Sequence, residues 1–329
     1  MRQVQFSRFG GPDVLDLVEK PTPAPGSGEI LVSVRAIGVN FAETLMRENR
    51  YAVTPELPAI PGTEVAGIVE RIGDKVEGLR AGARVAVPLF ATGAVTGGYS
   101  DHVVVNAALA VPLPEKISFE TATALMIQGL TALYLVQHIS PKDKVVLINA
   151  AAGGVGSLLV QLARRAGARS VIAAASSKAK LDFAATLGAD HGVDYTKPGW
   201  DDAVRAASGG AGPDLIYESV GGDVTRTCLS VLGPNGEIVI YGALNIQSFS
   251  LGIPELINLI FKNQSLTGFA LPTLLNSDGL ASGLATLFEL AASGALKVQI
   301  GGTYALKDAV SAHRAMEARA TTGKVVLVP

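Results

Sequence analysis

Hydrophobic and polar positions follow two different patterns along the 329 residues, and each pattern predicts a different kind of structure. Up to about residue 122, short apolar runs separated by glycine and proline predict strands, and their uneven spacing favours a small irregular barrel over a regular sandwich. The runs lie at residues 4–6, 30–34, 65–72, 84–87 and 102–105. Beyond about residue 271 the first pattern returns, with a helix predicted at 280–292 and short strands that end at 324–327.

Residues 123–271 alternate instead between apolar runs of strand length and segments of helical spacing. A helix at 122–139 comes first, and strands follow at 145–148, 171–175, 192–195, 214–217, 237–241 and 265–269, with helices such as 201–207 and 254–261 between them. This alternation predicts a doubly wound parallel sheet covered on both faces. We therefore expect a domain of residues 123–271 inserted into a domain made of 1–122 and 272–329, with the active site in the cleft between them.

Residues 144–180 predict a strand, a tight turn, a helix and a second strand, the size of one βαβ unit. A dinucleotide pyrophosphate binds backbone N–H groups at a helix N-terminus where no Cβ is in the way. Gly153 would let the backbone approach the phosphates, and Gly156 would let the helix pack closely on the strand. Ala151 departs from the usual fingerprint, which has a glycine there. No Gly-Lys-Ser/Thr follows the turn, so a nucleoside-triphosphate loop is disfavoured.

The end of the second strand of this unit predicts which dinucleotide binds. An NAD site has a carboxylate there for the ribose 2′-hydroxyl. This chain has no Asp or Glu between Gly167 and Leu181, and it has Ser176, Ser177 and Lys180 instead. Hydroxyl and ammonium groups suit a 2′-phosphate, which a carboxylate would repel. The sequence therefore predicts NADPH, although a serine N-cap followed by solvated lysines would give the same pattern.

Composition narrows the remaining classes of function. A net charge of −2 indicates no surface for nucleic acid. The first residues lack the apolar core of a signal peptide, and the longest apolar stretch, at 122–136, is shorter than a membrane span, so we expect no membrane association. The single cysteine, Cys228, allows no internal disulfide and fits a reducing cytoplasm.

Several motifs together resemble the zinc-independent medium-chain dehydrogenase/reductase family, near the NADPH:quinone oxidoreductases (zeta-crystallin-like) and the 2-enoyl reductases. The resemblance runs nearly end to end. It rests on the segments Gly38-Val39-Asn40-Phe41, Pro61-Gly62-Thr63-Glu64-Val65-Ala66-Gly67, Gly129-Leu130-Thr131-Ala132, Ala150 to Gly156, Ser219-Val220-Gly221 and Gly323-Lys324-Val325-Val326-Leu327. It implies a GroES-like β-barrel catalytic domain with an inserted Rossmann domain.

The resemblance also implies chemistry without a metal. Zinc-dependent relatives carry a cysteine where this chain has Asn40 and a histidine where it has Thr63. The histidines at 102, 138, 191 and 313 form no ligand pair at helical spacing, and we expect each to be an ordinary, partly exposed histidine. Hydride addition to a conjugated C=C–C=O or to a quinone spreads the new charge onto a carbonyl oxygen, which hydrogen-bond donors can support. We therefore expect a quinone or an α,β-unsaturated carbonyl as the substrate.

The family implies roles for three catalytic residues. Tyr51, eleven residues after Asn40, matches the spacing of a catalytic tyrosine in enoyl reductases and would hydrogen-bond the carbonyl oxygen. Asn40 would orient the substrate or line the pocket, and Thr131 would meet the nicotinamide. Each position has an ordinary structural explanation too: a half-buried loop tyrosine, a turn asparagine and a helix threonine bonded to its own backbone.

Cofactor residues are implied in the same way. The turn and the strand ends after it would contact NADPH through Ala152, Gly153, Gly154, Val155, Gly156, Ser176, Ser177, Lys180, Tyr195, Val220, Tyr241, Gly242, Ala243, Phe269 and Leu271. Relatives often dimerise through the edge strand of the Rossmann sheet, here 265–269, so we expect a homodimer. Two alternatives stay open: an acyl-thioester 2-enoyl reductase, and a low-activity NADPH-binding protein of the crystallin type.

Overall fold

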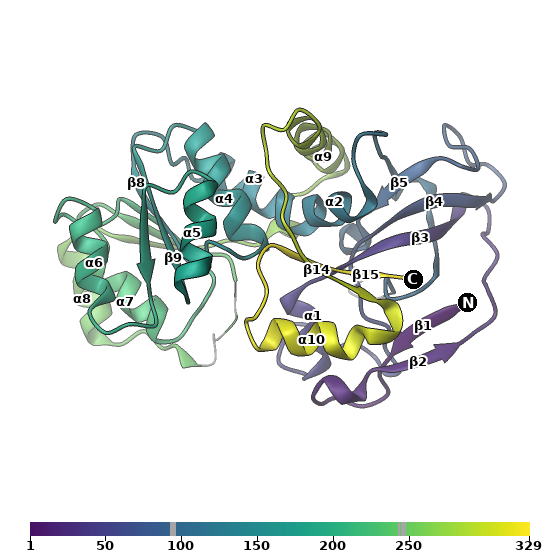
Figure 1. Ribbon diagram of the computed structural model, residues 1–329, viewed down its shortest axis with the longest axis horizontal. Coiled ribbons are helices and arrows are strands. Elements are labelled where there is room, and N and C mark those ends of the chain that lie inside the picture. Colours follow the sequence, from purple (N-terminus) through teal and green to yellow (C-terminus); the bar gives the residue numbers. More distant parts are fainter. Residues whose placement is uncertain (93–96, 243, 245–247) are drawn as a thin grey trace. The chain divides into compact units, whose positions relative to one another are not determined.

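The computed structural model describes residues 1–92, 97–242, 244 and 248–329 (Figure 1). The chain divides into two compact units, Met1–Leu130 with Leu275–Pro329, called the two-segment unit below, and Thr131–Leu274, called the inserted unit. The domain limits suggested by the sequence, after residue 122 and before residue 272, stay a prediction.

The two-segment unit is built on a seven-stranded sheet with the order β14-β15-β3-β4-β5-β7, in which β6 also pairs with β3. All of these pairs are antiparallel except β14 with β15. The strands are β3 (Glu29–Val39), β4 (Val65–Ile72), β5 (Arg84–Val87), β6 (His102–Asn106), β7 (Val111–Pro112), β14 (Ile300–Ala305) and β15 (Lys324–Val328), and a separate pair is formed by β1 (Arg2–Gln5) and β2 (Asp16–Glu19).

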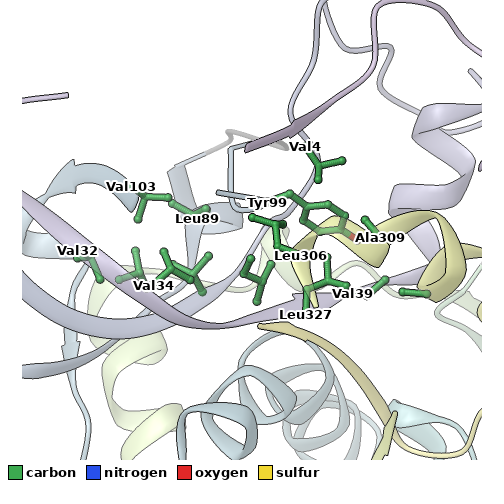
Figure 2. Close-up of a cluster of buried hydrophobic side chains, with 14 of the residues drawn as sticks. Val4, Val32, Val34, Val39, Leu89, Tyr99, Val103, Leu306, Ala309 and Leu327 are labelled. Atoms are coloured by element: carbon green, nitrogen blue, oxygen red, sulfur yellow. The ribbon is translucent and has the colours of Figure 1, made fainter. Parts of the chain in front are cut away.

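Helices of this unit connect and cover the strands. They are α1 (Phe41–Arg47), α2 (Phe119–Ala124), the π-helical turn η4 (Leu125–Gly129), α9 (Ser277–Ala292) and α10 (Ala309–Glu317), with short 3-10 turns η1 (Pro12–Val14), η2 (Leu89–Thr92), η3 (Ala107–Leu109) and η7 (Leu306–Asp308). Figure 2 shows the core, where aliphatic side chains from β3 and β15 pack with Leu306, Ala309 and the ring of Tyr99. Strand, helix and loop residues far apart in sequence thus share one core.

The inserted unit is a six-stranded parallel sheet in the order β10-β9-β8-β11-β12-β13. Its strands are β8 (Val145–Ile148), β9 (Ser170–Ala175), β10 (His191–Asp194), β11 (Leu215–Glu218), β12 (Glu237–Ile240) and β13 (Ser265–Gly268). The helices are α3 (Leu130–His138), α4 (Gly154–Arg165), α5 (Lys178–Thr186), α6 (Trp200–Ala207), α7 (Asp223–Val231) and α8 (Ile253–Phe261), followed by η6 (Leu271–Thr273).

In Figure 1, α4 and α5 lie on one face of this sheet and α6, α7 and α8 on the other. Strand β8 comes first in the sequence, with β9 on one side and β11 on the other, so the strand order reverses beside it. Ligands of doubly wound sheets bind at such a reversal, outside the carboxyl ends of the strands. The doubly wound parallel sheet expected from the sequence is confirmed.

The continuous helical run Phe119–His138, formed by α2, η4 and α3, is long and apolar enough to cross a membrane by length and composition. However, 67% of its most apolar window is buried inside the protein. That burial is typical of a core helix, and it explains the apolar sequence without a membrane.

Candidate functional site

The carboxyl ends of the six parallel strands gather the predicted cofactor residues at one edge of the sheet of the inserted unit. The glycine-rich turn follows β8, Ser176 to Lys180 follow β9, Tyr195 follows β10, Val220 follows β11, Tyr241 and Gly242 follow β12, and Phe269 to Leu271 follow β13. Ala243, which was predicted with them, lies outside the described residues. This edge, called the cofactor edge below, has the layout of a dinucleotide site.

The turn after β8 leaves helix α4 open at its N-terminus. Its N-cap is Gly153, which offers no side chain to the first N–H groups, and the first turn holds no acidic residue. The turn is held by its own backbone, because Gly153 N–H donates to Ala150 O at 2.8 Å and Ala151 N–H donates to Ala174 O at 3.0 Å. N–H groups without a side-chain cap and the positive end of the helix dipole together attract phosphate.

Hydroxyl and ammonium groups meet at the end of β9. Ser177 is the N-cap of α5, and the Lys180 ammonium donates to the Ser176 hydroxyl oxygen at 3.3 Å. The register of β10 on β9 ends with Asp194 opposite Ala175, and the next residue, Tyr195, donates its N–H to Ala175 O at 3.2 Å. The neighbouring Lys178 instead forms an exposed ion pair with Asp182 at 2.7 Å. The N-cap role of Ser177 and a phosphate-binding role are compatible, because the cap uses one lone pair of its hydroxyl.

Glu218, at the end of β11, shapes the turn that carries Val220. Its Oε1 accepts the N–H groups of Val220 at 2.7 Å and of Gly221 at 2.6 Å, and also the Thr225 hydroxyl at 2.9 Å. The amide of Asn149, next to the glycine-rich turn, donates to the other carboxylate oxygen. Burial raises the pKa of Glu218, although the N–H of Gly221 and the Asn149 amide work against that rise.

Sequence reasoning missed both Asn149 and Glu218. Each is a polar residue that follows or ends a buried apolar strand. That position was the available signal, because a polar group buried there needs partners at the neighbouring strand end.

The remaining predicted residues of the inserted unit lie as follows. Thr131 is buried near the start of α3. The ring of Phe269 meets His138 edge-on at 6.4 Å, and Leu271 is buried in η6. A Cβ added at Gly242 would lie 2.6 Å from the Cβ of Ser219, so the residues that follow β11 and β12 are in close contact.

In the two-segment unit, Asn40 and Thr63 belong to a buried group of polar side chains, called the polar cluster below. Its members are Asn40, Glu43, Arg47, Thr63, Glu64, Tyr99, His313 and Lys324. Asn40 is the N-cap of α1, and Glu43 and Arg47 come from one face of that helix, because residues four apart on a helix point the same way. Each of the eight side chains has a hydrogen-bond partner within the cluster.

Donors converge on Glu43. One carboxylate oxygen accepts the N–H and hydroxyl of Thr63, at 3.2 and 3.0 Å, and the other accepts Asn40 N–H at 3.1 Å and the Tyr99 hydroxyl at 2.8 Å. Burial raises the pKa of Glu43, and the Asn40 N–H, Lys324 and Tyr99 oppose this rise. Because these donors come from α1 itself, from Thr63 and from Tyr99, the arrangement holds α1 in place.

His313 corrects one expectation from the sequence, since it is fully buried and not partly exposed. Its Nε2 lies 2.9 Å from the Tyr99 hydroxyl oxygen, and its Nδ1 lies 2.8 Å from an Arg47 guanidinium nitrogen. The guanidinium can only donate, so Nδ1 accepts and Nε2 carries the proton. Burial, and then the charge of Arg47, lower the pKa of His313 to about 3, so the ring is neutral at pH 7.

Lys324, at the start of β15, was likewise missed as a member of the site. Its ammonium donates to Asn40 Oδ1 at 2.8 Å and pairs with Oε1 of Glu64. The Asn40 amide nitrogen donates to Glu64 Oε1 at 2.9 Å and to the Thr63 hydroxyl at 3.3 Å. Both amide hydrogens of Asn40 are therefore used inside the protein.

Tyr51 lies in the loop after α1, with 39% of its surface exposed. Four residues before it in the chain, Arg47 anchors α1 in the polar cluster, and Arg50 N–H donates to Leu45 O at 2.8 Å. The start of the Tyr51 loop is thus fixed, while the tyrosine itself is open to solvent.

Comparisons with known proteins found relatives that match nearly the whole chain. Residues 26–115 match the alcohol dehydrogenase GroES-like domain, and residues 154–292 match a family described as zinc-binding dehydrogenase. A quinone oxidoreductase of Salmonella typhimurium is 36% identical over 99% of both chains, and a 2-haloacrylate reductase of Burkholderia is 32% identical over 97% of this chain and 96% of its own. The crystal structure of Escherichia coli quinone oxidoreductase complexed with NADPH has a TM-score of 0.91, with 34% identity and full coverage of both chains.

The residues of the polar cluster do not fit a zinc ion. Zinc prefers thiolate and imidazole ligands, whereas Asn40 and Thr63 supply an amide and a hydroxyl. The Glu64 carboxylate is already paired with the Lys324 ammonium. Within the described ranges, no group of three or more His, Cys, Asp or Glu side chains could hold a metal ion.

Proposed function

Because this chain belongs to the quinone oxidoreductase family of medium-chain dehydrogenase/reductases, we propose that it is an NADPH-dependent enzyme that reduces quinones. The observation that carries this proposal is the meeting of Ser176, Ser177 and Lys180 at the end of β9, where the ribose of a dinucleotide is bound in Rossmann domains. An ammonium and two hydroxyls in that position favour the 2′-phosphate of NADPH over the plain ribose of NADH.

The cofactor edge suits NADPH along its length. The open N-terminus of α4 would hold the pyrophosphate through the N–H groups that follow Gly153, and Tyr195 would flank the 2′-phosphate. Val220, Tyr241, Gly242 and Phe269 to Leu271 would line the nicotinamide end, together with the hydroxyl of Thr131. When bound, NADPH supplies the hydride for the reduction.

For the substrate, Tyr51 is the proposed hydrogen-bond donor. Reduction of a quinone or a conjugated carbonyl places negative charge on a carbonyl oxygen, and a donor aimed at that oxygen lowers the barrier. Asn40 is poorly suited to that task because both its amide hydrogens are used by Glu64 and Thr63. In our proposal Asn40 lines the pocket, and the hydroxyl of Tyr51 supports the oxygen and donates the proton.

A second candidate substrate class is the conjugated carbonyl, favoured by the similarity to 2-haloacrylate reductase. A quinone and an activated alkene accept hydride in the same way, since both spread the charge onto an oxygen. The two alternatives that the sequence left open, an acyl-thioester reductase and a low-activity binding protein, are further outcomes of the same experiment.

The experiment is a panel of acceptors at fixed enzyme and NADPH: a benzoquinone, a naphthoquinone, an enone, a 2-haloacrylate and an enoyl thioester, each repeated with NADH. We expect the largest kcat/KM with a quinone and NADPH. A larger kcat/KM with the enone or with the thioester would identify the protein as an enone reductase or as an enoyl-thioester reductase, respectively. Binding of NADPH without consumption by any acceptor would make it a cofactor-binding protein.

We also propose that the protein is a homodimer and that it is located in the cytoplasm. Strand β13 ends the sheet, and helix α8, which precedes it in the chain, exposes Ile253, Ile260 and Phe261, at 73, 70 and 81%. An open strand edge and exposed apolar side chains are suited to a second copy of the chain. Light scattering on the wild type and on Phe261→Asp tests this, with a dimer expected for the first and a monomer for the second.

A further inference from the structure

A buried ion pair links three distant parts of the two-segment unit. Lys324, from β15, and Glu64, just before β4, have no exposed side-chain surface. The carboxylate crosses β3 at Gly38, where a Cβ would lie 2.2 Å from Glu64 Oε1. Glycine at this position therefore makes the room through which the carboxylate reaches Lys324 and Asn40.

One contact of the pair fixes Asn40. The Lys324 ammonium donates to Asn40 Oδ1 at 2.8 Å, while Asn40 Nδ2 donates back to Glu64 Oε1 at 2.9 Å. The ammonium can only donate, so it must face the amide oxygen of Asn40, and the carboxylate can only accept, so it must face the amide nitrogen. The amide of Asn40 has one permitted orientation.

The other contact of the pair fixes a backbone group. Glu64 Oε2 accepts the N–H of Ile127 at 2.8 Å. Ile127 lies in the π-helical turn η4, where the regular i→i−4 pattern of hydrogen bonds is broken. Such turns inside helices occur often at functional sites. Here the turn immediately precedes Leu130 and Thr131, so the position of the Ile127 peptide sets how the next helix begins.

We propose that Glu64 and Lys324 act as positioning residues for the reduction, holding the Asn40 amide and the η4 turn in one fixed arrangement. The proposal rests on the proposed function. Neither side chain touches substrate or cofactor in this account. They act through Asn40, which lines the pocket, and through the backbone that leads to Thr131.

The stability of the fold does not by itself explain why Glu64 and Lys324 form a buried ion pair. A buried ion pair loses its hydration and is often no more stabilising than apolar residues of similar size. An apolar pair would fill the same space, but it could neither orient the amide nor accept the Ile127 N–H. Orientation is the property that the two charges add.

The test compares Lys324→Met, Glu64→Gln, the double variant Lys324→Met/Glu64→Gln and Lys324→Arg. The double variant removes both charges of the pair together, so it keeps the test valid where a single variant does not fold. Arg314→Met is the matched control, because Arg314 forms an exposed ion pair with Asp13 in the same unit. For each protein, kcat and KM for a quinone, the Kd for NADPH by fluorescence and the melting temperature are measured.

We expect the folded Lys324→Met and double variants to lose about 10- to 100-fold in kcat, the range that small misplacement of positioning groups produces. The Kd for NADPH should stay within about twofold, since the cofactor edge lies in the other unit, and the double variant should lose no more than the single ones, because the pair acts as one unit. Lys324→Arg should recover part of kcat, and Arg314→Met should keep it.

A folded double variant with kcat within about twofold of the wild type would overturn the proposal. A loss of total activity that comes only from a smaller folded fraction, with a lower melting temperature and an unchanged kcat per folded molecule, would overturn it too. The proposed function is judged separately, by the turnover of the wild type on quinones. A wild type without that turnover refutes the function, whereas an active wild type with equally active variants refutes the positioning role alone.

Discussion

A Cβ atom on Gly156 would lie 2.2 Å from the carbonyl oxygen of Ala150. The first turn of α4 therefore packs directly on the backbone of the glycine-rich turn, and only glycine fits there. Ala150 itself has a positive φ of 48°, an uncommon conformation for a residue with a Cβ. The shape of the glycine-rich turn thus depends on a missing side chain at one residue and on an uncommon backbone conformation at the other.

Gly156→Ala should damage the turn. The added methyl group meets backbone, which cannot move aside cheaply, so we expect a loss of about 1–3 kcal/mol in the free energy of unfolding and at least about a tenfold rise in the Kd for NADPH. Chemical denaturation and fluorescence titration measure the two. The control is Gly11→Ala, where a Cβ meets no atom within 4 Å. Unchanged NADPH binding by a folded Gly156→Ala protein would show that this turn does not bind the cofactor.

Lys180→Ala should affect the two cofactors differently. The ammonium beside Ser176 would contact the 2′-phosphate, a charged hydrogen bond whose loss should raise the KM for NADPH about 10- to 100-fold. The KM for NADH should change little, because NADH lacks that phosphate. Lys178→Ala, which removes an exposed ion pair with Asp182, is the control and should alter neither. Equal effects of Lys180→Ala on the KM values of both cofactors would show that the Lys180 ammonium does not bind the 2′-phosphate.

Tyr51→Phe tests the proposed donor. If the hydroxyl gives the proton, its loss should lower kcat by about 10²–10⁴, as expected for a general acid. Because the residue is exposed to solvent, the melting temperature should change little. Near-normal turnover by Tyr51→Phe would mean that the proton comes from water.

His313 should make stability depend on pH. The folded protein holds the ring neutral with a pKa of about 3, while the unfolded chain binds a proton near pH 6.5. Between these values the unfolded state binds more protons, so stability falls as the pH falls from about 6.5 toward 3. Relative to His313→Gln, which keeps one donor and one acceptor, the wild type should lose about 3 kcal/mol between about pH 7 and pH 4. Denaturation curves of both proteins at each pH give this difference, and parallel curves would contradict it.

The fold was largely predictable because its strands are continuous apolar runs. The strand predicted at 145–148 is confirmed with the same limits, since all four residues of β8 are buried. The strand predicted at 30–34 in fact continues to Val39. The exposed Arg35 interrupts the apolar run at a β-bulge, and the residues after it return to the core.

The polar cluster could not be predicted in the same way. Its contacts join α1 with β15 and α10, more than 200 residues later in the chain, and no local pattern reports such pairs. A lysine at the start of an apolar strand and a glutamate just before another were the available signals. The π-helical turn also escaped prediction, because it is held by the distant Glu64 and not by its own sequence.

The central claim is that NADPH held by this chain is oxidised by a quinone. The most direct measurement mixes the NADPH-loaded protein with a quinone in a stopped-flow instrument and follows the NADPH absorbance through a single turnover. We predict the loss of one equivalent of NADPH per active site, at a rate that rises with quinone concentration to a plateau at or above kcat. Bound NADPH that persists at saturating quinone, in a protein that binds the cofactor tightly, would contradict the account.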